Sequence, residues 1–209
     1  MRHMAQQRHL NAAESNPRPR GGTRERVLAE ASDLFYTRGI RATSMDDVAE
    51  RSGILKGSLY YHFESKDALR DAYLALELAR REAWLDALAA SGRDPAGALL
   101  AVVAGHRAWI DAPDFRGCFI ANAAVEFPGD TAVAEIARRY LEHAEGLLEK
   151  ELRAAGCESS LARARELLAL LHGGLALARL GALDAAHAAT DAARRLVLES
   201  GAAPALAAS

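Results

Sequence analysis

Residues 43–69 read TSMDDVAERSGILKGSLYYHFESKDAL, and this stretch decides the fold. Ser44 followed three positions later by Asp47 is typical of a helix N-terminus, because each side chain can bond the backbone amide of the other. Gly53 supplies a turn in the middle of the stretch. The apolar positions lie on one face before the turn (Met45, Val48 and Ala49) and on one face after it (Ile54, Leu59 and Phe63). The stretch therefore predicts two short helices joined by a tight turn.

The second of these helices carries polar and aromatic side chains opposite its apolar face. They are Lys56, Ser58, Tyr60, Tyr61 and His62. Their tips are of the kinds that bond phosphate oxygens and base edges. Lys56 and Lys66 also lie at helix N-termini, where a positive charge opposes the helix dipole and a bound phosphate would reverse that cost. The stretch predicts a DNA-binding helix-turn-helix, and an ordinary helical hairpin with a solvated face is the alternative.

The same segment resembles the TetR family of bacterial transcriptional regulators. The resemblance covers roughly residues 23–72 and rests on Thr43-Ser44, Val48-Ala49, Gly53-Ile54, Gly57-Ser58-Leu59-Tyr60, His62-Phe63 and Ser65-Lys66-Asp67-Ala68-Leu69. It implies an all-α fold of about nine helices, with a three-helix DNA-binding head and a body that binds a ligand and dimerises. Together with the charge of Lys56, it implies contacts to double-stranded DNA from Thr43, Ser44, Gly57, Ser58, Tyr60, Tyr61, His62 and Lys66.

Composition sets wider bounds on the chain. Its 209 residues are 50% hydrophobic, and the formal net charge is −2. Residues 1–71 hold 12 Lys and Arg against 10 Asp and Glu, whereas the rest holds 14 against 18, so the end that carries the motif is the more basic one. Cys118 and Cys157 fit neither a disulfide framework nor a metal spacing. We expect a cytoplasmic protein without cofactor, metal or membrane segment.

Hydrophobic periodicity divides the chain into an all-helical series. We expect a disordered basic arm over 1–22, the helix-turn-helix domain over 23–72, a ligand-binding and dimerisation domain over 73–201, and a flexible tail over 202–209. Helices are predicted at about 23–38, 66–90, 94–111, 117–126, 130–155, 159–181 and 184–199, besides the two short ones of the motif.

The last two helices of the predicted body are expected to form a dimer interface. Gly173 and Gly174 lie mid-helix, where each costs roughly 1 kcal/mol relative to alanine, and close approach of another helix would justify that cost. The interface residues we expect are Leu167, Leu171, Gly174, Leu175 and Leu196, with packing inside one chain as the alternative. The expected pocket residues are polar or aromatic positions in apolar helices: Trp84, His106, Trp109, Cys118, Asn122, Glu126, His143 and His172.

The segment RGCFIANAAVEF, residues 116–127, resembles a TetR subgroup that includes sensors of reactive electrophiles. In this resemblance Cys118 matches the sensor cysteine, and Arg116 would lower the pKa of its thiol. The partner lysine of that subgroup falls at Arg179, which cannot repeat lysine's covalent chemistry. A small buried cysteine is the alternative.

These observations predict a homodimeric repressor that leaves a palindromic DNA operator when a small-molecule effector binds the body. A repressor switched through Cys118 and a DNA-bound architectural protein are the alternatives. An enzyme is not expected, since the sequence shows no paired general base, oxyanion loop or cofactor fingerprint.

Overall fold

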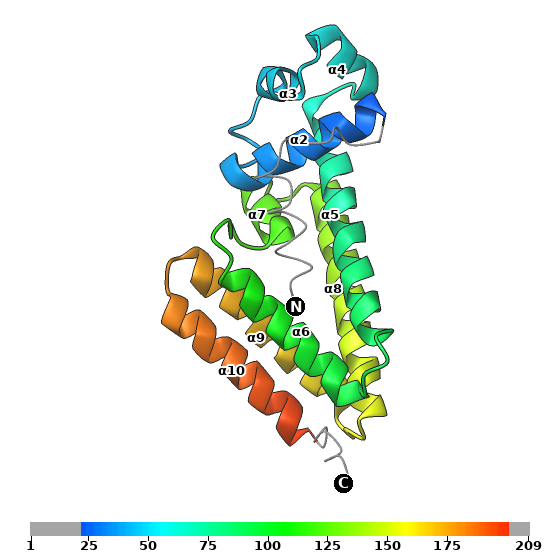
Figure 1. Cartoon of the computed structure of the whole chain (residues 1–209), viewed down its shortest axis with the longest axis vertical. Helices are drawn as coiled ribbons and strands as arrows, with labels where there is room; N and C mark the ends of the chain where they lie inside the picture. Colours follow the sequence, from blue (N-terminus) through cyan, green and yellow to red (C-terminus); the bar gives the residue numbers. More distant parts are fainter. Residues whose placement is uncertain (1–21, 201–209) are drawn as a thin grey trace. The chain divides into compact units, whose positions relative to one another are not determined.

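The computed structural model describes residues 22–200, so most of the expected basic arm and the whole expected tail lie outside the described residues. The described chain forms nine helices and no strand, which confirms the all-α prediction. Figure 1 labels them in chain order: α2 (Thr23–Arg38), α3 (Met45–Ser52), α4 (Lys56–His62), α5 (Lys66–Ala89), α6 (Pro95–Ile110), α7 (Phe119–Glu126), α8 (Thr131–Ala154), α9 (Ser160–Arg179) and α10 (Leu183–Glu199).

Two helix boundaries differ from the predicted ones because a glycine interrupts the helix. Gly117 has a φ of 92°, so α7 begins at Phe119 instead of at 117. Gly181 has a φ of 83°, and α9 ends at Arg179 instead of at 181. Both values lie in the left-handed region, which glycine adopts without the steric cost that a Cβ brings.

The described residues divide into two compact units. The head unit comprises 22–79 and 119–137, and therefore contains α2, α3, α4, α7 and parts of α5 and α8. The body unit comprises 80–118 and 138–200, with the remainder of α5 and α8 and the whole of α6, α9 and α10.

The core of the head unit forms around α2. The apolar positions of α2 are at most 3% exposed, as their spacing suggests: Val27, Ala31, Leu34 and Phe35. The ring of Phe35 meets that of Tyr73 edge to face, with centroids 5.4 Å apart. Leu59 and Phe63, on the inward face of α4, are 0% and 3% exposed. The three-helix head of the prediction thus has a closed apolar core.

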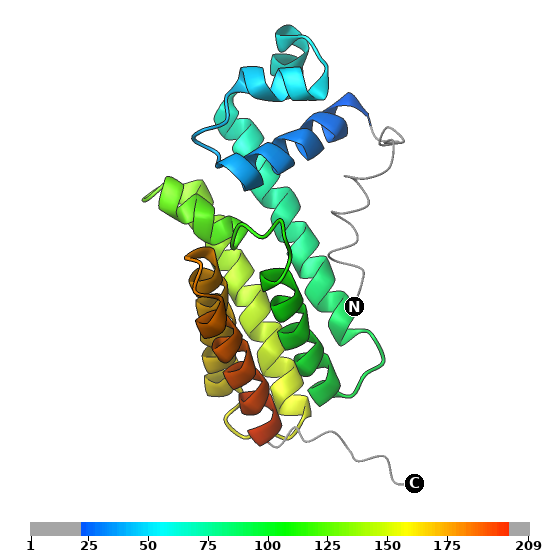
Figure 2. The ribbon, with the colours of Figure 1, turned by 60° about the vertical axis from the view of Figure 1, so that its left-hand side comes forward.

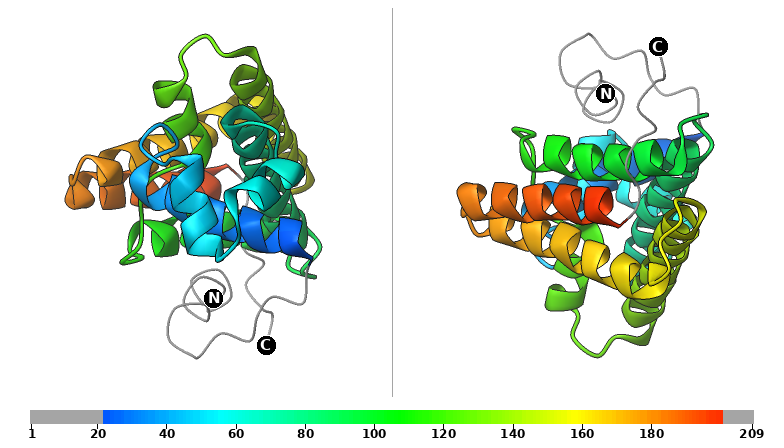
Figure 3. Two further views of the ribbon diagram at one scale, coloured as in Figure 1. Left: turned by 90° about the horizontal axis from the view of Figure 1, so that it is seen from above. Right: turned by 90° about the horizontal axis from the view of Figure 1, so that it is seen from below.

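Within the body unit, α6, α9 and α10 pack against one another. They run alongside each other in Figure 2, and in the view from below in Figure 3 α10 lies between α6 and α9. The helices lie close together at Gly174, where a Cβ would make an ordinary contact with the carbonyl oxygen of Ala186 at 3.4 Å. The body core includes Leu99, Val102, Leu148, Leu167 and Leu171, each at most 1% exposed.

Candidate nucleic-acid interface and effector cavity

The α3–turn–α4 segment is built by local interactions that the sequence encodes. Ser44 N donates to Asp47 Oδ2 at 2.7 Å, and Asp47 N donates to Ser44 Oγ at 3.1 Å, so both halves of the capping box are made. The hydrogen bonds that the hydroxyl and then the backbone N–H of Ser44 donate to the Asp47 carboxylate lower the pKa of that carboxyl. Gly53 then ends α3 in the left-handed conformation, with φ 64° and ψ 34°. The predicted turn is therefore present at its predicted residue.

The outer surface of α4 carries large exposed side chains. Tyr61 is 86% exposed, Tyr60 is 41% exposed, and Leu55, just before the helix, is 83% exposed. Ser58 and His62 are half-buried, and a Cβ at Gly57 would meet nothing within 4 Å. The residues of α4 expected to touch DNA are thus wholly or partly open to solvent; Lys56, which is also exposed, is considered below.

Thr43 does not reach that surface. It is 1% exposed, and its hydroxyl donates to the backbone oxygen of Gly39 at 2.9 Å. We therefore remove Thr43 from the expected DNA contacts. Its role is to fix the loop between α2 and α3.

The two lysines at helix N-termini both bond to groups of the chain itself. Lys56 Nζ lies 2.7 Å from Asp46 Oδ1, and this hydrogen bond raises the pKa of the lysine. Lys66 Nζ donates to the backbone oxygen of Arg41 at 3.0 Å. Asp46 already offsets the cost of placing the positive charge of Lys56 at a helix N-terminus, so a bound phosphate is not needed to explain why a lysine is found there. Both pairs are exposed and can exchange their partner for a phosphate.

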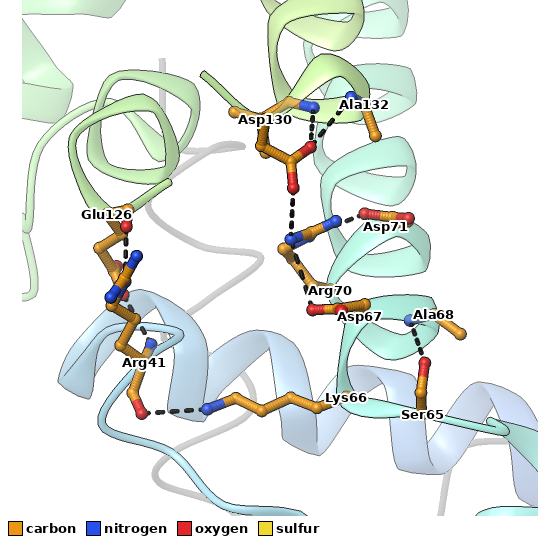
Figure 4. A network of polar contacts seen from close by, with 11 residues as sticks. Arg41, Ser65, Lys66, Asp67, Ala68, Arg70, Asp71, Glu126, Asp130 and Ala132 are labelled. Atoms are coloured by element: carbon orange, nitrogen blue, oxygen red, sulfur yellow. Dashed lines mark hydrogen bonds and ion pairs between the residues drawn. The ribbon is translucent and has the colours of Figure 1, made fainter. Parts of the chain in front are cut away.

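Figure 4 shows a polar network in the head unit that sequence reasoning missed. The carboxylate of Glu126 accepts the backbone N–H groups of Ile40 at 3.1 Å and Arg41 at 2.6 Å. Arg41 Nε donates in return to the backbone oxygen of Glu126 at 2.5 Å. Glu126 was expected in the ligand pocket, and this is a correction: it holds the loop after α2. No periodic signal marks a carboxylate that bonds amides 85 positions earlier.

Arg70 is a second unexpected feature of the head unit. It is 5% exposed, and its guanidinium lies 2.9 Å from Asp130, 2.8 Å from Asp71 and 3.4 Å from Asp67. It also lies 4.9 Å from the ring centroid of Phe127. Asp130 in turn accepts the first amides of α8, and the bond from Val133, followed by the charge of Arg70, lowers the pKa of Asp130. This arrangement ties α5 to the start of α8.

The body unit contains a small cavity of about 10 Å³. Its apolar lining includes Leu85, Val102, Ala144, Leu148, Leu168 and Leu171, and its polar or aromatic lining is Arg81, Trp84, His106, Tyr140 and His172. A volume of this size holds about one water molecule. Three of the predicted pocket residues therefore line one cavity, although each comes from a different helix.

The two histidines and the tyrosine of this cavity are held in their neutral forms. Burial lowers the pKa of His106 to about 3, and the nearby charge of Arg81 acts in the same direction. Burial followed by Arg81 also lowers the pKa of His172. The phenol of Tyr140 has a raised pKa, again mainly through burial. The cavity thus combines one cation with neutral hydrogen-bonding groups.

Trp109 does not line the cavity but contacts two residues that do, Arg81 and His106. The guanidinium carbon of Arg81 lies 3.6 Å from the Trp109 ring centroid, and the ring of His106 meets Trp109 edge to face at 6.3 Å. The ring of Trp84 covers Gly105, where a Cβ would stand 2.4 Å from an indole carbon. Both tryptophans of the chain are therefore part of this cluster.

Other predicted pocket residues lie elsewhere. His143 lies beside Asp86, 3.2 Å away, in a separate open groove. Asn122 belongs, like Glu126, to the head unit. Cys118 is 4% exposed and does not line the cavity, although it lies near enough to Tyr140 to help raise the pKa of that phenol.

The residues expected at a dimer interface are buried inside one chain. They are Leu167, Leu171, Gly174, Leu175 and Leu196, and the four leucines are 0% to 8% exposed. A side chain without accessible surface cannot contact a second copy, so this set is corrected to core packing. The surfaces of α9 and α10 that remain open are formed by other residues.

Two kinds of site were not found along residues 22–200. No group of three or more His, Cys, Asp or Glu side chains in this range is arranged to hold a metal ion. None of the helices in the same range has the length and apolar character that a membrane crossing needs.

Comparison with known proteins connects this geometry to a family. Residues 27–73 match the family model of bacterial regulatory proteins of the tetR family. The chain is 40% identical over 93 residues to the HTH-type transcriptional repressor KstR2 of Rhodococcus jostii, covering 44% of this chain and 46% of that protein. It is 44% identical over 61 residues to the HTH-type transcriptional activator FasR of Mycolicibacterium smegmatis, covering 29% and 26%. The matches thus span less than half the length of these curated relatives.

The fold is similar over most of the chain to that of solved structures. SCO4454, a TetR-family transcriptional regulator from Streptomyces coelicolor, superposes with a TM-score of 0.78 at 24% identity. The superposition covers 86% of this chain and 96% of SCO4454.

Proposed function

Because this chain belongs to the TetR family of bacterial transcriptional regulators, we propose that it is a homodimeric repressor that a small-molecule effector releases from a palindromic operator. The observation that carries the proposal is the solvent-exposed surface of α4, which follows a fully formed capping box and turn in the chain. We place the protein in the bacterial cytoplasm, where its operator would be.

The DNA contacts that we propose come from α4 and the residues beside it. Ser44, Lys56, Gly57, Ser58, Tyr60, Tyr61, His62 and Lys66 form this set. Tyr61 and Leu55 expose most of their apolar surface, which duplex DNA would cover, and an apolar side chain at Leu55 suits a thymine methyl group. Lys56 and Lys66 would exchange their present acceptors for phosphate oxygens.

Dimerisation is supported by small residues on the open face of α9. The small residues Ala169, Gly173 and Ala176 recur at helical spacing there, and Leu180, directly after the helix, is 82% exposed. Nothing in the described chain requires a glycine at 173, because a Cβ there would meet nothing within 4 Å. A helix-interior glycine costs roughly 1 kcal/mol, so we infer that a second copy packs against Gly173.

The effector would act by preferring one of two conformations of the protein. A ligand that binds both conformations equally shifts no equilibrium, so it must bind better to the one that cannot span two half-sites. We assign the effector to the body cavity, since Trp84, His106 and His172 converge there. We do not assign the switch to Cys118, whose side chain is 4% exposed.

The experiment is a mobility-shift titration with the DNA next to the protein's own gene. We expect a specific complex whose formation falls steeply with salt. The variant Tyr61→Ala should weaken it at least tenfold, whereas Lys150→Ala, which removes an exposed charge of the body unit, should not. Failure to shift any fragment more tightly than an unrelated duplex would contradict the proposal.

A further inference from the structure

The polar groups of the body cavity come from four helices and share one electrostatic character. Arg81 lies on α5, His106 on α6, Tyr140 on α8 and His172 on α9. No Asp or Glu is among the described residues that line the cavity. The one permanent charge in the lining is therefore the guanidinium of Arg81, which is 8% exposed.

The two imidazoles differ in the atom that they offer to a ligand. His106 Nδ1 lies 2.9 Å from the backbone oxygen of Val102, so this nitrogen carries the proton and Nε2 is left as an acceptor. His172 Nε2 is buried and has no hydrogen-bond partner within the described chain. A buried polar atom without a partner costs about 1–3 kcal/mol, which a ligand atom at that place would recover.

The aromatic groups define the rest of the ligand. Trp84 and Trp109 flank Arg81 at 5.8 Å and 3.6 Å from its guanidinium carbon, and aliphatic side chains form the remaining wall. An arginine guanidinium binds a carboxylate through two parallel hydrogen bonds. Arg81 has five N–H donors, so it can form these two bonds in addition to the contacts that it already makes. Indoles and leucines beside such a guanidinium suit an apolar chain or ring.

We propose that the body cavity binds an organic carboxylate with an apolar body, with Arg81 and His172 Nε2–H holding the carboxylate and with Trp84 and the leucines of the lining covering the apolar part. The inference deepens the proposed function by giving the chemical class of the effector. The inference rests on the proposed function only where it calls the ligand an effector; the binding of a carboxylate does not depend on that function.

Binding must enlarge the cavity, which in this structure holds about one water. Trp84 is the side chain best placed to move, because it is half-buried and lies across the backbone at Gly105. Its displacement would leave room beside Arg81 on the same helix. Ligand entry is thus coupled to a change in the surroundings of an indole.

That coupling provides a direct readout without DNA. The chain contains two tryptophans, and both belong to the cavity cluster. We would titrate the full-length protein with phenylbutyrate, phenylbutyramide and phenylbutylamine, and with decanoate, decanamide and decylamine, while following tryptophan emission. Each trio keeps one apolar body and replaces the anionic head group by a neutral amide or a cationic amine.

The expected result is a saturable change of emission with at least one carboxylate, and a Kd about tenfold or more below those of its amide and amine, which corresponds to about 1.4 kcal/mol. Equal affinity within both trios, or no binding of either carboxylate, overturns the inference.

Variants locate the site. Arg81→Gln should abolish the preference for the carboxylate, whereas Arg81→Lys should keep part of it. Arg165→Gln is the matched control, since Arg165 pairs with Glu145 on the exposed surface of the body unit. If circular dichroism shows that Arg81→Gln does not fold, the variant His172→Phe is tested in its place. We expect His172→Phe to lose carboxylate affinity several-fold. An unchanged preference in the folded variant overturns the assignment.

The outcomes separate this inference from the proposed function. A protein that binds its operator but shows no preference for a carboxylate refutes the ligand class alone. A protein that prefers a carboxylate but binds no operator refutes the repressor alone.

Discussion

Glu126 accepts a hydrogen bond from the backbone N–H of Arg41 at 2.6 Å, across 85 positions of sequence. The same carboxylate bonds Ile40, and the guanidinium of Arg41 lies 5.0 Å from the ring centroid of Phe127. The backbone oxygen of Arg41 accepts from Lys66, one of the proposed phosphate contacts. The end of α7 is therefore linked through one residue to the proposed DNA-contacting surface of the head unit.

Glu126→Ala should loosen that link. Two amides lose a charged acceptor, and because the bonds are partly solvated we expect about 1–2 kcal/mol of lost stability. Operator affinity should also fall, since the loop between α2 and α3 loses the carboxylate that holds the amides of Ile40 and Arg41. Denaturant unfolding and mobility shift measure the two effects. The control is Glu142→Ala, which removes an exposed pair with Arg138, and equal effects of the two variants would contradict this role.

Thr43→Val should destabilise the protein by about 1 kcal/mol, because the backbone oxygen of Gly39 loses its hydroxyl donor in a buried place. Thr43→Ser keeps the donor and should recover most of that loss. Since Thr43 does not face DNA, the affinity of the folded fraction should be unchanged in both. A loss of affinity in the folded fraction of Thr43→Val, recovered in Thr43→Ser, would restore Thr43 as a DNA contact.

The burial of His106 predicts a loss of stability in acid. Its pKa is about 3 in the folded state against 6.5 for the free side chain, so below pH 6.5 the unfolded chain binds a proton that the folded chain does not. The free energy of unfolding is therefore highest above pH 6.5, and protonation of His106 in the unfolded chain lowers it by about 2 kcal/mol at pH 5. His106→Gln should lose this part of the pH dependence. Denaturant unfolding at several pH values measures it, and parallel curves for the two proteins would count against it.

Gly173→Glu should convert the proposed dimer into a monomer. A side chain at 173 finds open space in the protomer, so the variant should fold, but a second copy could not approach it. Gly146→Glu is the matched control: Gly146 also lies inside a helix, and a Cβ there would meet nothing within 4 Å. Light scattering after size exclusion measures the mass. A Gly173→Glu protein that keeps the wild-type mass would place the interface elsewhere.

The helix-turn-helix could be predicted from sequence because its determinants are local. The capping pair Ser44 and Asp47, the turn at Gly53 and the inward face of Leu59 and Phe63 all lie within one short stretch. Thr43 shows the limit of this reasoning, since its burial depends on how the loop returns to Gly39.

The body was less predictable for a related reason. Periodicity identified α9 and α10 as amphipathic but did not say whether Leu167 and Leu175 face their own chain or another copy. Polar residues in apolar helices were reasonable pocket candidates. Only three of them line the cavity, because their helices pack against one another there: Trp84, His106 and His172. Arg81, which the sequence analysis did not single out, supplies the cavity's charge.

The sequence by itself determined the helices and the DNA-binding motif, because caps, turns and hydrophobic periods act over a few neighbouring residues. The tertiary structure alone decided that Glu126 holds the amide of Arg41 and that Arg81 and His172 share a cavity. These pairs are brought together by packing between helices far apart in the chain, and no spacing within either helix encodes that packing.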